Sequence, residues 1–386
     1  MHAYRYVFKL IAVCCLILPL TGCWDIKEVQ DMNYVTAIGV DYEDGQYVVY
    51  TQMLDFTTVA KAETGKSDRP AQVWISKTKG KTINWAVDQV YNSSQRRTVW
   101  SHVSSIVISD KVLKSAVLPK LDSIGRYQEV RMTPWVFGTS HSIEELFNTR
   151  AFFNMSPLFT ILHEPIDQFN QRSVIAPIRY FDFLADLTEP GYTEMLPSLS
   201  IDSETWSTQE KKDPKMSING GFCLYDEKLS GFLANKDLDG LRWMQKETKR
   251  SPLLVTDDGQ QAVVALSNPK VKTQLTFVKG EPKFRIHVRL NGNVVEVSQD
   301  VSKTELEKSA ANAVKEEIIA TFNKGIETQS DVYSLEHLVF KQNPAAWKRL
   351  KQASGTSTII HKQSLESVMV DVHLEHTGMK LLPRKY

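Results

Sequence analysis

The chain has 386 residues, with 46 basic and 45 acidic side chains, and 42% of its residues are hydrophobic. This length is enough for two or three domains. The near-zero net charge excludes the strongly basic footprint of nucleic-acid-binding proteins, so no nucleic acid partner is expected. Beyond residue 23 no run of 18 consecutive apolar residues occurs, so the sequence predicts no membrane-spanning helix there.

The first 22 residues have the pattern of an export signal. Two cations precede an apolar run of 11 residues, 10–20, which is too short to span a bilayer, since spanning takes about 20 residues. The run ends in Leu20-Thr21-Gly22-Cys23, a string that resembles a bacterial lipobox. The resemblance implies cleavage between Gly22 and Cys23 and a diacylglycerol on the Cys23 thiol. Two acyl chains would hold the mature protein firmly at a membrane surface.

The cysteines of the mature chain are too few for an internal disulfide. Cys14 and Cys15 leave with the signal, and Cys23 carries the lipid, so Cys223 alone remains. Cys223 lies in an apolar stretch, residues 221–225. This setting is typical of a buried, unreactive thiol.

The first folded segment alternates strand and helix signals. Residues 34–41 and 46–54 read as two strands joined by an Asp44-Gly45 turn, and the polar stretch 57–70 reads as a loop. Apolar periodicity then predicts further elements: a helix over 82–91, a strand over 104–109, a helix over 112–124, a strand over 133–139 and a helix from residue 142. We therefore expect a mixed α/β domain over 23–200.

A second and a third domain are expected beyond a stretch, 190–214, in which Pro, Gly, Ser and charged residues dominate. The small middle domain, 215–262, has strand signals over 216–225 and 229–233 and a helix signal over 238–246. In the C-terminal domain, 263–386, four more strands are predicted: 263–266, 274–278, 284–290 and 294–297, the last two joined by an Asn291-Gly292 turn. The predicted fold is a three-domain α+β or mixed α/β ectodomain with mostly antiparallel or mixed sheets flanked by helices.

The clearest helix begins at Ser302, where Ser302 and Glu305 form a capping box. One apolar stripe follows at helical spacing: Leu306, Ala310, Ala313, Val314, Ile318 and Phe322. Gly325 stands where a C-terminal cap is expected. A helix over 343–351 and a strand over 368–374 complete the chain.

A search for catalytic and metal-binding patterns yields no candidate site. His373 and His376 are three residues apart in a predicted strand and would point to opposite faces, so no metal site is expected. Ser104 and Ser105 lie within a strand signal and not on a nucleophile elbow, and His102 is expected to be a hydrogen-bonded packing residue. No phosphate-binding or dinucleotide motif indicates a cofactor. The sequence therefore favours a binding or assembly protein over an enzyme.

Several stretches, taken in order, resemble the C subunit of spore germinant receptors, the Ger(x)C lipoprotein family. They are Gly22-Cys23-Trp24-Asp25, Ile38-Gly39-Val40-Asp41, Arg126-Tyr127-Gln128-Glu129-Val130-Arg131, Gly240-Leu241-Arg242-Trp243, Pro344-Ala345-Ala346-Trp347-Lys348 and residues 371–378. The resemblance implies three α/β domains and a lipid anchor at the outer face of the spore inner membrane. It also implies a complex with two integral-membrane partners, the A and B subunits, and a role in sensing nutrient germinants. It brings no catalytic, metal or cofactor residues, and no ligand-binding residue is nominated.

Two other classes of protein remain as alternatives. A solute-binding lipoprotein of an importer would share the anchor, but it needs two similar lobes with mainly parallel sheets, and the hairpin signals Asp44-Gly45 and Asn291-Gly292 oppose that. A lipid-anchored hydrolase would need a serine, a histidine and a carboxylate that meet in a cleft.

Overall fold

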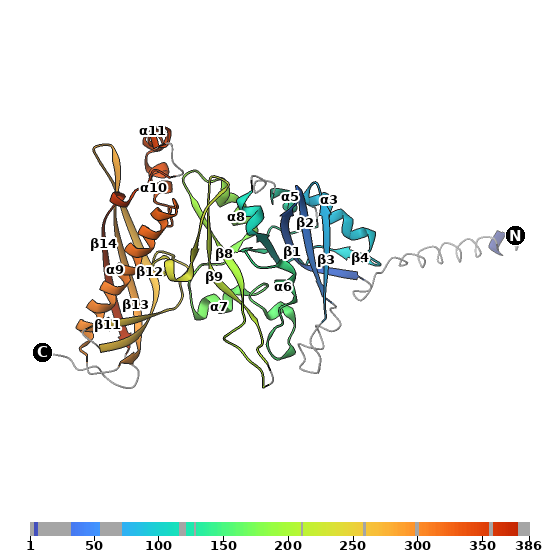
Figure 1. The fold of residues 1–386 in the computed structure, drawn as a ribbon, viewed down its shortest axis with the longest axis horizontal. Helices are drawn as coiled ribbons and strands as arrows, with labels where there is room; N and C mark the ends of the chain where they lie inside the picture. Colours follow the sequence, from blue (N-terminus) through green and yellow to red (C-terminus); the bar gives the residue numbers. More distant parts are fainter. Residues whose placement is uncertain are drawn as a thin grey trace.

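The computed structural model describes residues 4–6, 32–54, 72–115, 121–126, 129–209, 211–257, 260–297, 301–354 and 358–376. Within these residues the chain forms an elongated molecule with two β-sheets, a larger one toward the N-terminus and a smaller one toward the C-terminus (Figure 1). Helices flank both sheets, so the predicted α+β class is confirmed. In this part of the chain no helix combines the length and the apolar character needed to cross a bilayer.

The larger sheet contains ten of the strands that the structure describes. They are β1 (Met32–Glu43), β2 (Gln46–Leu54), β3 (Val73–Gly80), β4 (Arg97–Val99), β5 (Ser105–Ser109), β6 (Trp135–Thr139), β7 (Ile178–Arg179), β8 (Thr193–Asp202), β9 (Lys215–Tyr225) and β10 (Lys228–Ala234). The main order is β10-β9-β8-β6-β5-β1-β2-β3, with β4 beside β1 and β7 beside β6. The four central strands β8, β6, β5 and β1 are parallel, and the outer pairs are antiparallel.

Helices cover both faces of this sheet, because every residue of β5 and β6 is buried and such strands need cover on each side. The helices are α3 (Ile83–Asp88), α4 (Asp110–Lys114), α5 (Asp122–Gly125), α6 (Ile143–Asn148), α7 (Pro165–Gln171) and α8 (Tyr180–Thr188). Side chains of α3, α4, α5 and α8 pack into one apolar core, and side chains of α6 pack into a second. The Asp44-Gly45 hairpin between β1 and β2 is present as predicted.

The structure corrects two predictions in this half. The single helix expected over 112–124 is wrong, because α4 ends at Lys114 and Ser115 takes an extended conformation with φ −94° and ψ 157°. The stretch 190–214 is not irregular throughout, because β8 occupies its residues 193–202 and pairs with β9. Met195, Leu196 and Leu199 are the apolar signal of β8, which the surrounding polar residues obscure in the sequence. The polar stretch 57–70 lies outside the described residues.

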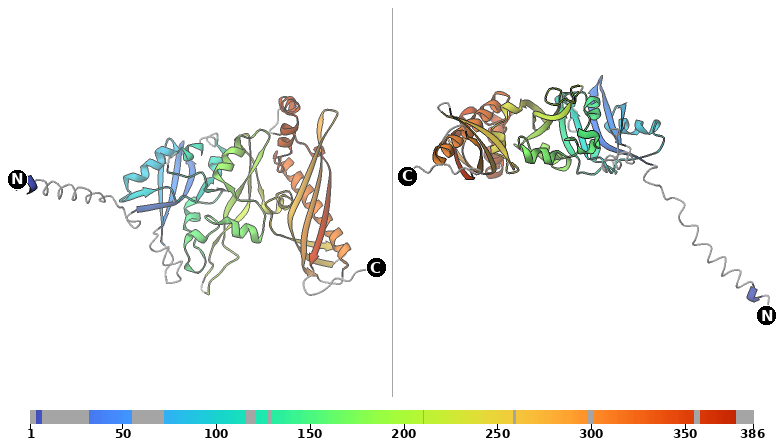
Figure 2. Two further views of the ribbon diagram at one scale, coloured as in Figure 1. Left: turned by 180° about the vertical axis from the view of Figure 1, so that it is seen from behind. Right: turned by 90° about the horizontal axis from the view of Figure 1, so that it is seen from below.

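The smaller sheet has four described strands in the order β11-β12-β13-β14. Their bounds are β11 (Ser251–Asp257), β12 (Gln260–Val278), β13 (Glu281–Val297) and β14 (Leu365–His376). Helix α9 (Lys303–Glu327) packs along one face of the sheet, as Figures 1 and 2 show from opposite sides. The capping box of Ser302 and Glu305 is confirmed, and the predicted apolar stripe from Leu306 to Phe322 is present and faces the sheet.

The predicted Asn291-Gly292 hairpin is wrong. β13 continues through both residues, and the turn lies instead at Lys279 and Gly280, whose φ values are +53° and +87°. Gly292 serves a close approach of two strands, because a Cβ atom there would lie 2.5 Å from the carbonyl oxygen of Ala265. The four short strands expected over 263–297 are therefore parts of two long ones.

Two helix predictions are also corrected. The stretch 238–246 forms no α-helix; the structure has short 3₁₀ turns, η7 (Asn235–Asp237) and η8 (Leu241–Trp243). Gly325 does not end α9, which continues to Glu327. A Cβ atom on Gly325 would lie 2.7 Å from the carbonyl oxygen of Ser330, so glycine lets the chain fold back closely on the helix.

The division into domains at 23–200, 215–262 and 263–386 stays a prediction. In the structure, strands from the first two of these segments share the larger sheet, and β11 and β12 join the smaller one. Two helices, α10 (Leu335–Gln342) and α11 (Pro344–Ser354), follow α9. Ser334, just before α10, bonds to Thr193 of β8, and Glu336 on α10 bonds to Tyr225 of β9. The two helices form a junction between the two sheets.

Candidate functional site

The residues nominated for lipid attachment, Gly22 and Cys23, lie outside the described residues, so cleavage and lipidation stay predictions. Cys223 is in β9 and is fully buried, as the sequence predicts. Burial raises the pKa of its thiol to about 12, and its Sγ atom lies 3.9 Å from the Met195 sulfur. A protonated, enclosed thiol is a packing group and not a nucleophile.

His102 and His373 contact other side chains of the fold and do not form a metal site in the described part of the chain. His102 is exposed, with its ring edge-on to Tyr34 at 4.9 Å between ring centroids. His373 lies on β14, and its Nδ1 atom is 3.5 Å from a carboxylate oxygen of Glu307 on α9. Within the described ranges, no three His, Cys, Asp or Glu side chains gather as metal ligands would.

One serine and one histidine do meet beside the larger sheet. The Ser104 hydroxyl lies 2.6 Å from Nδ1 of His163, and Nε2 of His163 lies 3.0 Å from the side-chain oxygen of Gln52. The same oxygen accepts a hydrogen bond from the Thr36 hydroxyl at 2.9 Å, and the Gln52 amide donates to the Phe147 carbonyl at 2.9 Å. The order Ser, His and a third polar group resembles the order in a hydrolase triad.

The charge needed for that chemistry is missing from this cluster. The third group is the neutral amide of Gln52, whereas a triad uses a carboxylate to stabilise the imidazolium that forms. His163 is buried, and burial lowers its pKa to about 3, so it does not take up a proton near neutral pH. The cluster therefore connects β1, β2 and the segment after α6, and it does not support the hydrolase alternative.

A second buried polar cluster lies at the junction between the two sheets. The carboxylate of Glu336, on α10, is fully buried and accepts four hydrogen bonds. The donors are the Tyr225 hydroxyl at 2.6 Å, the Trp347 indole at 2.9 Å, the Thr358 hydroxyl at 2.8 Å and the Ile359 backbone N–H at 3.0 Å. A buried carboxylate needs such partners, because an unpaired one costs several kcal/mol.

The junction is closed by further contacts from both sides. The Lys351 ammonium lies 2.7 Å from the Tyr225 hydroxyl and 3.9 Å from the Glu336 carboxylate. Asp331 accepts a hydrogen bond from the Glu336 backbone N–H at 2.7 Å, and burial raises the pKa of Asp331 to about 7. These contacts join α10 and α11, which pack beside the smaller sheet, to β9 of the larger sheet.

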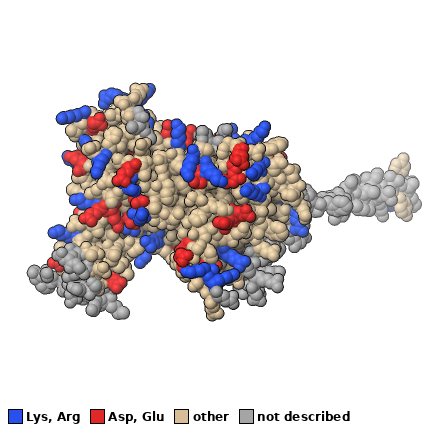
Figure 3. Space-filling view, viewed as in Figure 1, with Lys and Arg blue, Asp and Glu red and all other residues tan. Residues whose placement is uncertain are grey.

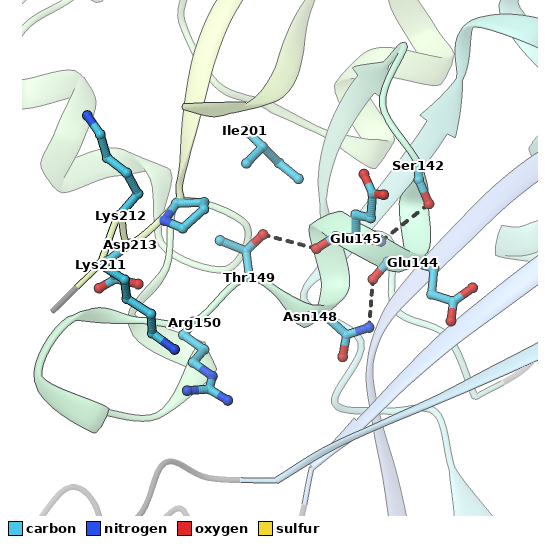
Figure 4. A pocket seen from close by; sticks show the side chains of 11 residues that line it. Ser142, Glu144, Glu145, Asn148, Thr149, Arg150, Ile201, Lys211, Lys212 and Asp213 are labelled. Carbon is cyan, nitrogen blue, oxygen red and sulfur yellow. Dashed lines mark hydrogen bonds between the residues drawn. The ribbon is translucent and has the colours of Figure 1, made fainter. Parts of the chain in front are cut away.

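An open pocket of about 700 Å³ lies where α6 meets the loop between β8 and β9 (Figure 4). Ser142 begins α6 by accepting a hydrogen bond from the Glu145 backbone N–H at 3.4 Å. Asn148 and Thr149 bond back to carbonyls of the same helix, each at 3.0 Å, which orders its end. The other residues that line the pocket are Glu144, Arg150, Ile201, Lys211, Lys212, Asp213 and Pro214.

The pocket is lined by charges of both signs. Figure 4 shows Glu144 and Glu145 on the helix side, and Arg150, Lys211 and Lys212 together with Asp213 on the loop side. Such a surface can pair with a ligand or peptide that carries both signs, although each exposed ion pair contributes only about 0–1 kcal/mol. The sequence signals are the helix start at Ser142 and the polar run at 211–214, but only the fold brings them together.

Comparison with known proteins places both halves of the chain in one family. Residues 25–201 match the model of the spore germination protein N-terminal domain, and residues 219–378 match the model described as spore germination B3/GerAC like, C-terminal. The two matches together span most of the chain.

Full-length relatives and one solved structure agree with this. Spore germination protein KC of Bacillus subtilis (strain 168) is 23% identical over 402 residues, which cover 96% of this chain and 95% of that protein. Spore germination protein B3 of the same organism is 21% identical, covering 87% of this chain and 89% of the relative. The crystal structure of the GerBC protein has the same fold, with a TM-score of 0.55 and 15% identity over 91% of this chain and 99% of that one.

Proposed function

The chain belongs to the Ger(x)C family of spore germination proteins, and from that membership we propose that it is a lipid-anchored, non-enzymatic subunit of a nutrient germinant receptor. The proposed location is the outer face of the cell membrane that becomes the spore inner membrane. Its proposed partners are the integral-membrane A and B subunits. The observation that carries the proposal is family similarity through both halves of the chain.

The proposed anchor is a diacylglycerol on Cys23. Its support is the order of a cationic segment, an apolar run too short to span a bilayer and the string Leu20-Thr21-Gly22-Cys23. The proposed non-enzymatic role is supported by the neutral amide and the low pKa of His163 in the Ser104 cluster. If the protein acts by binding, its exposed surfaces would contact partners, and the junction between the sheets would set how those surfaces are placed.

The anchor is tested by replacing one cysteine at a time. Cys23→Ala should leave the protein uncleaved or release it from membranes, whereas Cys223→Ala should keep it membrane-bound, because Cys223 is buried in the fold. Detergent extraction and the mass of the N-terminal peptide are the measurements. A normally processed, detergent-requiring Cys23→Ala protein would contradict the anchor.

The receptor role is tested in spores that lack the gene. Dipicolinate release is followed with amino acids, sugars and nucleosides as separate germinants. Loss of the response to one class, with the others intact and with restoration by the wild-type gene, is the expected result. Solute binding by the purified protein with unchanged germination would instead favour the importer alternative, although the two unlike sheets of this fold oppose it.

A further inference from the structure

An exposed aromatic cluster projects from the larger sheet beside the pocket. Phe153 is 89% exposed, Trp206 is 49% exposed and Phe152 is 38% exposed. The Phe152 ring stands edge-on to Trp206 at 4.8 Å between centroids, and Phe153 lies 5.8 Å from Phe152. We call these three residues the aromatic tip. It joins the turn after α6 to the loop between β8 and β9, two segments far apart in the sequence.

The backbone holds the tip in place. Phe153 and Asn154 have φ values of +56° and +55°, a region that side chains other than glycine rarely adopt. The chain on the C-terminal side is fixed by Ser156, which is fully buried and accepts a hydrogen bond from the Leu158 N–H at 3.2 Å. An outward-facing phenylalanine on a strained turn exposes apolar surface that the fold itself does not use, and such surface indicates an interaction site.

Basic and acidic side chains both lie beside the tip. Arg150 and Lys211 lie on the adjoining pocket wall, and the Lys215 ammonium lies 4.9 Å from the Phe152 ring centre. Lys212 pairs with Glu204 at 3.3 Å and Lys215 pairs with Asp213 at 2.6 Å, so acidic groups offset part of this charge. Figure 3 shows basic and acidic side chains together just above an uncharged projection at the lower edge of this face.

We propose that the aromatic tip inserts into the headgroup layer of the membrane that carries the Cys23 anchor, with Arg150 and Lys211 against lipid phosphates. This inference rests on the proposed function, because it assumes the anchor. Tryptophan and phenylalanine beside cations are the side chains that favour this layer.

A tether makes a weak second contact effective. The eight residues from Trp24 to Asp31 allow at most about 28 Å between the Cys23 anchor and β1. Because the tethered tip is already concentrated at the bilayer, a contact too weak to recruit a free protein can still fix the orientation. The larger sheet would then face the membrane with the side that carries the aromatic tip and the pocket, at the loop between β8 and β9.

The test uses the acylated full-length protein in vesicles of phosphatidylglycerol and phosphatidylcholine with acyl chains brominated near the headgroup. A Trp24→Phe background removes the tryptophan next to the anchor. In that background bromine should quench the fluorescence of Trp206, and Trp206→Phe should abolish the quenching. Trp74→Phe is the matched control, because Trp74 is 64% exposed on β3 and lies outside the tip; it should leave the quenching unchanged.

Phe153→Ser tests insertion without removing the fluorophore, and we expect it to reduce the quenching of Trp206. Quenching of Trp206 that is unchanged by Phe153→Ser would overturn the role of the tip. Anchored protein without quenching of Trp206 would overturn the inference and leave the proposed function intact, and shielding of Trp206 only when the A and B subunits are present would identify a protein contact instead. Protein that washes off the vesicles would show that the anchor itself has failed.

Discussion

The Tyr225 hydroxyl on β9 donates a 2.6 Å hydrogen bond to the buried carboxylate of Glu336 on α10. This bond joins the larger sheet to the helices that pack beside the smaller sheet. Tyr225 and Glu336 are 111 positions apart in the chain. Burial, followed by the negative charge of Glu336, raises the pKa of Tyr225, so the hydroxyl stays a donor at all ordinary pH values. We therefore expect the relative placement of the sheets to depend on this carboxylate.

Removing the Glu336 carboxylate should therefore cost more than removing any one of its donors. Glu336→Ala leaves four donors facing a buried cavity, and we expect a loss of about 3–5 kcal/mol in the free energy of unfolding. Tyr225→Phe removes one donor and should cost about 1–2 kcal/mol. Urea unfolding of the two variants measures both. Equal losses would show that Glu336 does not act as the centre of the junction.

Gly240 should not tolerate a side chain. A Cβ atom there would lie 2.3 Å from the carbonyl oxygen of Glu317 and 2.6 Å from the Cα atom of Ile318, both in α9. Gly240→Ala should cost about 1–3 kcal/mol by pushing η8 away from the helix. It should also shift the fluorescence of Trp243, whose indole donates to Glu317 at 2.6 Å. Gly45→Ala, at an open turn with φ +77°, is the control and should leave that fluorescence unchanged.

The Cys223 thiol should react only when the protein unfolds. It is fully buried and its pKa is raised to about 12, so the thiolate is scarce and inaccessible at pH 8. A thiol reagent added to the folded protein should detect no cysteine at position 223, and one thiol should appear in denaturant. Labelling of Cys223 at the rate of a free thiol under native conditions would contradict its burial.

His163 should make the fold sensitive to acid. Its pKa falls from 6.5 to about 3 on folding, so the unfolded chain binds the proton more tightly. The stability that neutral His163 contributes is complete above pH 6.5 and is lost as pH falls toward 3, at about 1.4 kcal/mol per pH unit. The difference in unfolding free energy between wild type and His163→Gln should shrink over that range.

The comparison of wild type with His163→Gln also removes the opposite pH dependence that Asp331 contributes to the unfolding free energy. The pKa of Asp331 is raised to about 7, so its contribution is present in acid and declines as pH rises through 7. Because Asp331 is the same in both proteins, its contribution cancels in the difference. A difference that stays constant from pH 7 to pH 4 would show that folding does not lower the pKa of His163.

Local patterns predict the elements of this fold better than its junctions. The Asp44-Gly45 hairpin, the Ser302 cap and the stripe of α9 depend on residues close in sequence, and the structure has all three. Asn291-Gly292 has an equally strong turn signal, but the close approach of Ala265 uses that glycine within a strand. A local signal was overridden there by packing between strands.

The buried polar clusters could not be predicted in this way. Gln52 and His163 are 111 residues apart, as are Tyr225 and Glu336, and neither pair belongs to a sequence motif. The aromatic tip likewise needs the turn at Phe153 and the loop at Trp206 to meet. Each of these sites depends on the order of strands in the larger sheet, which local periodicity does not determine.

Because β12 is long, a small rotation at one end of the smaller sheet becomes a large displacement at the other end. A strand of 19 residues spans about 60 Å, and β12 is paired with β13 along most of that length. A rotation of about 5° at one end of such a strand would move the far end by about 5 Å. A small angular change at the Glu336 junction would therefore become a displacement of about 5 Å at the far end of the paired strands.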